Sequence, residues 1–172
     1  MKPIGRAAVL LVGAAVGVLT AGAGAEEGGS VDSRFALKAA SAGLLEVKLG
    51  QLAADRASSA EVKMFAARMV DEHLKSNLEL ATLATVRRWT LPKEPDAKHQ
   101  AQYDKLAKLS GPDFDRMYAR QMVENHQEAV KLFEKEIKNG QDEQLIQWAT
   151  KTLAVLKEHL KLAQKLKENQ GP

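Results

Sequence analysis

The stretch Met64–His73, which reads MFAARMVDEH, returns further along the chain as Met117–His126, MYARQMVENH. Methionine, alanine, methionine, valine and histidine keep their places, and the aromatic position and the first acidic position match by type. In each copy the histidine follows a methionine by four residues and a valine by three, so these three side chains share one helix face. The pattern predicts two amphipathic helices, each with a histidine on its apolar face.

A second repeat links two other parts of the chain. Glu-His-Leu-Lys occurs at residues 72–75 and again at residues 158–161. Its second copy places His159 on the apolar face of another helical segment. Three of the four histidines are therefore expected to face inward from the middle of separate helices.

Apolar spacing predicts long helices over about residues 33–56, 61–89, 112–139 and 142–168, and a short helix over about 97–109. Ser58-x-x-Glu61 resembles a capping box at the start of the second helix. Pro92 and Pro95 end that helix, and Pro112 restarts the chain as a helix.

The connection over residues 90–111 decides the predicted topology. Its extended part and short helix together reach roughly 45–50 Å, which exceeds the length of about 42 Å expected for the second helix. The chain can therefore return along the bundle and start the next long helix parallel to the second. The predicted fold is all-α: a ferritin-like four-helix bundle with one long crossover that contains a short helix.

The start of the chain is typical of a secretory signal. Lys2 and Arg6 precede an uncharged apolar segment, and Ala23-Gly24-Ala25 offers a small-x-small cleavage site. We expect a signal peptide over residues 1–25, with an uncleaved anchor as the alternative. No later stretch is apolar enough to span a membrane.

The rest of the chain is expected to form one domain. A disordered leader is predicted over residues 26–32, the bundle over residues 33–168 and a tail over residues 169–172.

Composition excludes several kinds of chemistry. The 172-residue chain has no cysteine, so disulfides, thiolate metal sites and thiol nucleophiles are absent. Without Lys2 and Arg6, the 25 basic residues fall to 23, against 22 acidic ones. These charges alternate along the helices and form no basic stripe with aromatic residues. Nucleic-acid binding is therefore not expected.

One polar layer is predicted inside the bundle. Glu46, His73, His126 and His159 lie on the apolar faces of the four long helices. Counted from the turn near Ser58, Glu46 and His73 differ in height along the bundle by about 5 Å. Counted from the turn at Gly140, His126 and His159 differ by about 7.5 Å. Three imidazoles and a carboxylate at one level would suit Zn, Fe or Cu.

Other interpretations of this layer stay open. The four groups could instead form a hydrogen-bonded core without metal. Di-iron oxidase chemistry is disfavoured, because that site needs Glu-x-x-His on two helices and the positions three before these histidines hold Val70, Val123 and Leu156. No other catalytic motif is present, so an enzymatic role is not expected. Asp115, three turns before the histidine of its helix, is a more distant accessory candidate.

Methionines one turn before two histidines suggest a softer site. Met69 and Met122 would add thioether ligands suited to Cu(I), although methionine is also a common core residue. The fourth histidine, His99, stands among polar residues and is expected to be solvated. Trp148 is expected in the core.

The order and spacing of these residues resemble domain-of-unknown-function family 4142. The matching motifs are Glu46-Val47-x-Leu49-Gly50-Gln51-Leu52-Ala53, Val62-Lys63-x-Phe65-Ala66-x-x-Met69-Val70-x-x-His73, Leu109-Ser110-Gly111-x-x-Phe114-Asp115-x-x-Tyr118, Met122-Val123-x-x-His126, Thr152-Leu153 and His159-Leu160. The resemblance implies an exported bacterial protein, periplasmic or outer-membrane-associated, with a ferritin-like bundle and no established activity. It also implies that Glu46, His73, Asp115, His126 and His159 are the recurrent positions.

Two functions from different classes follow. One is a metal-binding protein for storage, buffering or redox chemistry. The other is a structural or stress-linked bundle whose surface binds a partner and whose polar layer is only a core network. The positions of the four inward groups distinguish the two.

Overall fold

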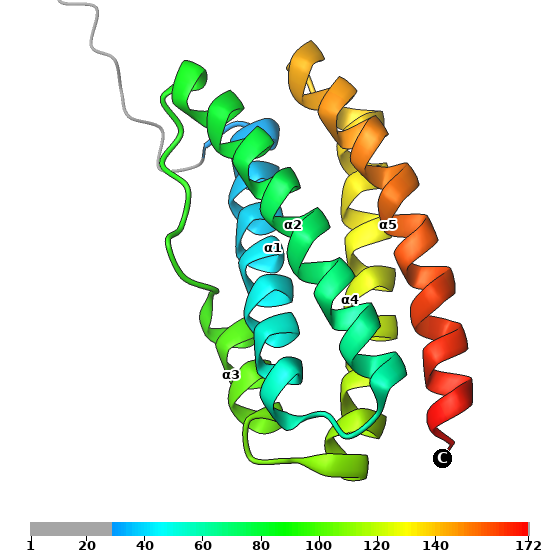
Figure 1. Cartoon of the computed structure of the whole chain (residues 1–172). Helices are drawn as coiled ribbons and strands as arrows, with labels where there is room; N and C mark the ends of the chain where they lie inside the picture. Colours follow the sequence, from blue (N-terminus) through cyan, green and yellow to red (C-terminus); the bar gives the residue numbers. More distant parts are fainter. Residues whose placement is uncertain (1–28, 172) are drawn as a thin grey trace, which may run out of the picture.

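The computed structural model describes residues 29–171, and all regular elements in that range are α-helices. They are α1 (Val31–Arg56), α2 (Ala60–Arg87), α3 (Ala97–Leu106), α4 (Gly111–Asn139) and α5 (Glu143–Gln170). Figure 1 shows the four long helices side by side, with the short α3 along the outer side of α1. The predicted all-α bundle is confirmed. The predicted signal peptide lies outside the described residues.

Contacts at the two ends of the bundle fix the direction of each helix. Near one end, Ser59 at the start of α2 donates its N–H to Asp115 near the start of α4. At the other end, Arg87, the last residue of α2, pairs with Asp142 just before α5. Helices α2 and α4 therefore run parallel, as Figure 1 shows, and the predicted long crossover is confirmed.

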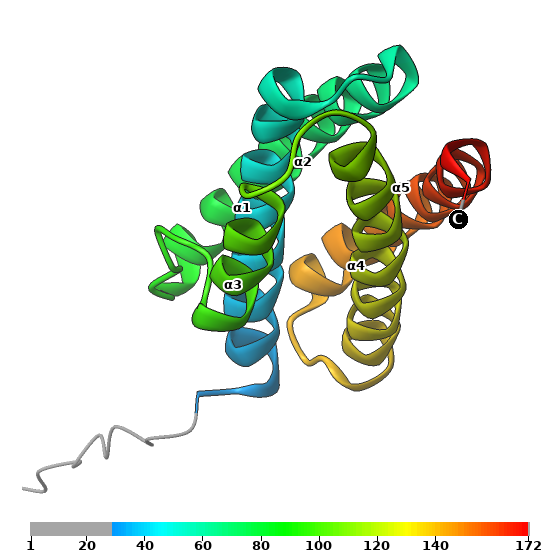
Figure 2. The same cartoon turned by 90° about the horizontal axis from the view of Figure 1, so that it is seen from below.

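The long helices form two antiparallel hairpins that pack face to face. Figure 2 shows the hairpin of α1 and α2 beside that of α4 and α5. Helix α1 contacts α4 and helix α2 contacts α5, so α2 and α4 occupy opposite corners. Every neighbouring pair of long helices is antiparallel, which is the arrangement of a ferritin-like bundle.

Several helix ends differ from the predicted boundaries by a few residues, three of them as follows. Helix α1 begins at Val31, inside the predicted leader, because the Ser30 hydroxyl caps it by accepting the Ser33 N–H at 3.0 Å. Helix α2 is capped by Ser59 instead of the predicted Ser58. Helix α5 continues to Gln170, into the predicted tail.

Two apolar clusters fill the bundle and leave a polar layer between them. The cluster near the α1–α2 turn contains Leu49, Phe65 and Met69, and the cluster at the other end contains Phe133 and Trp148, among others. Along α2, α4 and α5, the inward histidines fall between residues of the first cluster and residues of the second. Burial of these clusters stabilises the fold and holds the polar layer at a fixed height.

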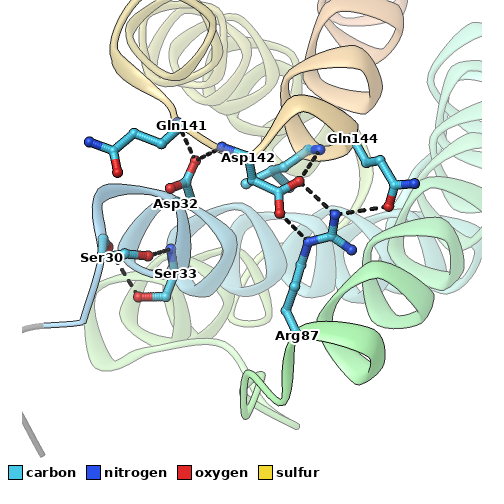
Figure 3. Close-up of polar contacts among 8 residues, drawn as sticks. Ser30, Asp32, Ser33, Arg87, Gln141, Asp142 and Gln144 are labelled. Carbon is cyan, nitrogen blue, oxygen red and sulfur yellow. Dashed lines mark hydrogen bonds and ion pairs between the residues drawn. The ribbon is translucent and has the colours of Figure 1, made fainter.

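Charged groups tie the helix ends together at the end of the bundle that carries the α4–α5 turn. Figure 3 shows Arg87 donating to the Asp142 carboxylate, with Nη2–Oδ1 at 2.7 Å, and to Gln144. The Asp32 carboxylate, at the start of α1, accepts the backbone N–H groups of Gln141 and Asp142. The start of α1, the end of α2 and the turn into α5 are thereby held together.

Glu136 lies buried at this same end of the bundle, and its burial makes stability depend on pH. Burial, the hydrogen bond to Asp32 and the negative charges of Asp32 and Asp142 raise the pKa of Glu136 to about 7. This pKa exceeds that of Glu136 in the unfolded chain, so the protonated form of Glu136 favours the folded state. The resulting stabilisation is complete below about pH 4.5 and is lost as pH rises through about 7.

Glu136→Gln should therefore leave stability near pH 4 unchanged and raise the free energy of unfolding at pH 8 by about 1–3 kcal/mol. Denaturant titrations at the two pH values measure this, with Glu134→Gln on the exposed face of α4 as the control. Equal stability of Glu136→Gln and the wild type at pH 8 would contradict it.

Gly50 sets the close approach of α1 and α2. A Cβ atom at this position would lie 2.5 Å from Val70 Cγ2 and 2.9 Å from the Ala66 carbonyl oxygen. The second contact is with a backbone atom that no side-chain rotation can move away. A larger residue would therefore push α1 and α2 apart or make one slide along the other.

Candidate metal centre

The three inward histidines meet between the two apolar clusters. His73 comes from α2, His126 from α4 and His159 from α5, and each is at most 8% exposed. Their ring centroids are 5.4–5.7 Å apart. One ring nitrogen from each lies within 4.8 Å of the other two. The predicted meeting of these side chains is observed.

Hydrogen bonds on the outer sides of two rings define their tautomers. His126 Nδ1 lies 2.8 Å from the Met122 carbonyl oxygen, which only accepts, so Nδ1 carries the proton. His159 Nε2 lies 2.8 Å from Glu72 Oε2 and donates to that carboxylate. The remaining nitrogens, Nε2 of His126 and Nδ1 of His159, therefore carry free lone pairs.

Both nitrogens are buried and have no partner among residues 29–171, and His73 Nε2 is likewise buried without a partner there. Each orphaned buried nitrogen costs about 1–3 kcal/mol of desolvation. A tetrahedral ion with bonds near 2.1 Å needs donor atoms about 3.4 Å apart, so small side-chain rotations would bring three nitrogens within 4.8 Å into range.

The surroundings favour the neutral form of two of the imidazoles, those of His73 and His159. Burial, followed by the neighbouring His126 and His159, lowers the pKa of His73 well below its ordinary value. Burial also lowers the pKa of His159, and its bond to Glu72 only partly opposes this. Neutral imidazole is the form that binds a metal.

Glu46 lies in the same cavity as the histidines but outside the set of atoms that converge within 4.8 Å. Its Oε1 accepts from Asn125 Nδ2 at 2.8 Å, while its buried Oε2 has no partner within the described part of the chain. Burial raises the pKa of Glu46, and His126 and Asn125 oppose that rise. An ion held by the histidines would therefore have an unsatisfied carboxylate oxygen in its own cavity.

The structure does not bring the other three candidates into this group. Met69 and Met122 are fully buried in the apolar cluster near the α1–α2 turn and do not line the cavity. Asp115 accepts the Ser58 and Ser59 N–H groups at 2.9–3.2 Å and the Ser58 hydroxyl, so its carboxylate holds the start of α2. Its role in the fold explains its burial.

The expectation that His99 is solvated was wrong. Its side chain is 15% exposed, and Nδ1 lies 2.7 Å from Ser41 Oγ and 3.1 Å from Asp96 Oδ2. Packing of α3 on α1 buries it, whereas the surrounding polar sequence suggested a free surface. Trp148 is in the core as predicted.

Sequence reasoning missed Glu72 and Arg68. Arg68 donates to Glu72 at 2.7 Å and to Glu158 at 2.8 Å, and so orients the carboxylate that holds His159. Burial alone would raise the pKa of Glu72, but the bonds from Arg68 and His159 outweigh it and lower that pKa. The Glu-His-Leu-Lys repeat was the available signal, because its two copies meet here across α2 and α5.

Glu72→Gln should weaken metal binding about 10–100-fold, because loss of an outer carboxylate makes its histidine a poorer ligand. Glu158→Gln is the matched control: it also removes a partner of Arg68 but does not touch His159. Competitive titration against a chelator measures both. Equal affinities of the two variants would count against the role of Glu72.

The fold and the site together define an all-α bundle with a buried three-histidine cluster that could hold a metal ion. The chain belongs to the DUF4142 family, a domain of unknown function, whose model matches residues 18–166. The resemblance found in the sequence is thereby confirmed.

Two solved structures share the fold at low sequence identity. One, described as "putative secreted protein DUF305" from Streptomyces coelicolor, has a TM-score of 0.70 and 19% identity over 83% of this chain and 93% of its own. A DUF305 fragment from Deinococcus radiodurans has a TM-score of 0.71 and 14% identity over 82% and 97%. Among curated proteins, none matches the sequence. Within residues 29–171, every helix is too short or too polar to cross a bilayer.

Proposed function

We propose that this protein is an exported metal-binding bundle in which His73, His126 and His159 hold one Zn, Fe or Cu ion, with Glu46 as the fourth ligand. The observation that carries the proposal is that one ring nitrogen of each histidine lies within 4.8 Å of the other two, in a cluster where each ring also has a buried nitrogen without a partner in the described chain. The other ring nitrogen of His126 is hydrogen-bonded to the Met122 carbonyl oxygen. The other ring nitrogen of His159 is hydrogen-bonded to the Glu72 carboxylate. Metal-binding histidines are commonly held in this way.

The ligand types of the site support a divalent ion. Neutral imidazoles add no charge and an ionised Glu46 would offset one positive charge, while the charge of the outer Glu72 is already paired with Arg68. Imidazole and carboxylate suit Zn, Fe and Cu in their divalent states. The absence of Met69 and Met122 from the cavity lining removes the support for a thioether site selective for Cu(I).

A hydrogen-bonded core without metal is the competing proposal. It accounts for the outer bonds of His126 and His159 but leaves the inner nitrogens unpaired, at a cost in stability for each. Export rests on the signal-like sequence of residues 1–25 and agrees with the description of the Streptomyces neighbour.

Metal titration of the purified exported protein tests the function. We expect one Zn²⁺ or Co²⁺ per chain after dialysis, a higher melting temperature with metal, and visible Co²⁺ bands of a nitrogen-ligated site. Binding should weaken as pH falls through about 6–7, because protons compete for the imidazoles. Substoichiometric metal, with melting unchanged by chelator or by Zn, Fe or Cu, would overturn the proposal.

A further inference from the structure

The cavity that contains the histidines extends to the surface of the crossover. It has a volume of about 400 Å³, and its lining includes Asp96, Lys98 and His99 as well as Glu128 of α4. Lys98 and Glu128 are exposed and form an ion pair of 2.6 Å. The mouth of the cavity therefore lies between α3 and α4, with opposite charges on its two sides.

A second carboxylate–histidine pair stands at this mouth. Asp96 Oδ1 caps α3 by accepting the His99 N–H, and its Oδ2 accepts from the Ser41 hydroxyl at 2.9 Å. Because that hydroxyl proton is used, His99 Nδ1 carries its own proton and donates to Ser41 Oγ. Within residues 29–171, the other ring nitrogen, Nε2, makes no hydrogen bond, whereas Nδ1 is held by Ser41.

Glu46 connects the mouth with the inner cluster. It lines the same cavity as His99 at the mouth and His126 in the inner cluster. One of its oxygens is held by Asn125, and the other is buried without a partner among the residues described. A carboxylate in this position can bind a cation from either side.

We propose that His99 and the free oxygen of Glu46 form a second, transient site for divalent cations at the mouth of the cavity, through which metal reaches the three histidines. The proposal rests on the metal-binding function above. Asp96 and Ser41 orient His99 for this task, and Glu46 passes the ion inward. The Lys98–Glu128 ion pair must open for the ion to enter.

Rates of metal loading test the proposal. Stopped-flow mixing of the metal-free exported protein with Co²⁺ should give loading at least tenfold slower in His99→Asn, with an unchanged final stoichiometry. Asparagine can still donate to Ser41 but lacks Nε2, so the docking of α3 is kept. Gln100→Ala, in the next position of α3, should load at the wild-type rate. Equal rates for His99→Asn and the wild type would overturn the proposal.

A second measurement separates this site from the inner one. In His126→Leu, where the inner cluster is incomplete, weak Co²⁺ binding should remain and should fall at least tenfold when His99→Asn is added. If the wild type binds no metal, the proposed function fails. If it binds metal but His126→Leu retains no binding that depends on His99, only the second site fails.

Discussion

His126→Leu is expected to lower the affinity for metal about a thousandfold while leaving the metal-free bundle at least as stable as the wild type. One of the four proposed ligands is worth roughly a quarter of the 10–16 kcal/mol that structural Zn²⁺ sites supply, or up to about 4 kcal/mol. The substitution also removes a buried nitrogen that has no partner within residues 29–171. Stability and function therefore respond in opposite directions at this position.

Melting with and without Zn²⁺ checks this, and Gln127→Leu on the exposed side of the same helix is the control for an added leucine. The control should keep the full rise in melting temperature with metal, and His126→Leu should lose most of it at the same Zn²⁺ concentration. A His126→Leu protein that still gains the full stabilisation from stoichiometric Zn²⁺ would contradict the role of His126.

The same site should make the metal-free wild type sensitive to acid. The pKa values of His73 and His159 are lowered in the folded state, mainly by burial. Below about pH 6.5 the unfolded chain therefore binds more protons than the folded one, and stability falls as pH decreases. The fall should be smaller in His126→Leu, because His73 and His159 then have one neighbouring imidazole fewer.

Asp115→Ala is expected to destabilise the bundle by about 2–4 kcal/mol. Its carboxylate accepts two backbone N–H groups, of Ser58 and Ser59, at the positive start of α2. Removing it leaves both donors unpaired and removes a favourable charge from the helix terminus. For a chain of this size the loss corresponds to a fall in melting temperature of roughly 5–15 °C.

Asp113→Ala is the matched control, because Asp113 lies two residues before Asp115 in α4 but is 74% exposed and, within residues 29–171, pairs only with Arg116. The melting temperature of Asp115→Ala should lie below that of Asp113→Ala by most of the expected fall of roughly 5–15 °C. The affinity of Asp115→Ala for metal should stay near the wild-type value, because Asp115 does not line the cavity. A loss of stability no greater than that of Asp113→Ala would show that the carboxylate is dispensable.

The sequence was sufficient to place the histidine layer. Spacing of 3.6 residues per turn identifies the inward face, and the rise of 1.5 Å per residue gives the height of each inward group. The repeat between Met64–His73 and Met117–His126 is now explained, because α2 and α4 run parallel at opposite corners and turn similar faces to the centre.

Features that depend on contacts between helices could not be predicted in this way. Glu72 precedes an inward histidine and looks like a surface residue until α5 brings His159 against it. His99 lies in a polar stretch, and its burial follows from Ser41, a small polar residue on the face of α1 that receives the crossover. Local periodicity carries no information about such partners.

The close packing at Gly50 would link the choice of metal at the proposed site to a residue that does not line its cavity. Val70, which fills the space beside this glycine, precedes His73 by three residues on the same helix. A slip of one residue along α2 would move that imidazole by about 1.5 Å, far more than the 0.2 Å within which bond lengths identify a metal site. Selectivity of the proposed site among ions would then depend on helix register, and a single added methyl group at position 50 would change it without altering any proposed ligand.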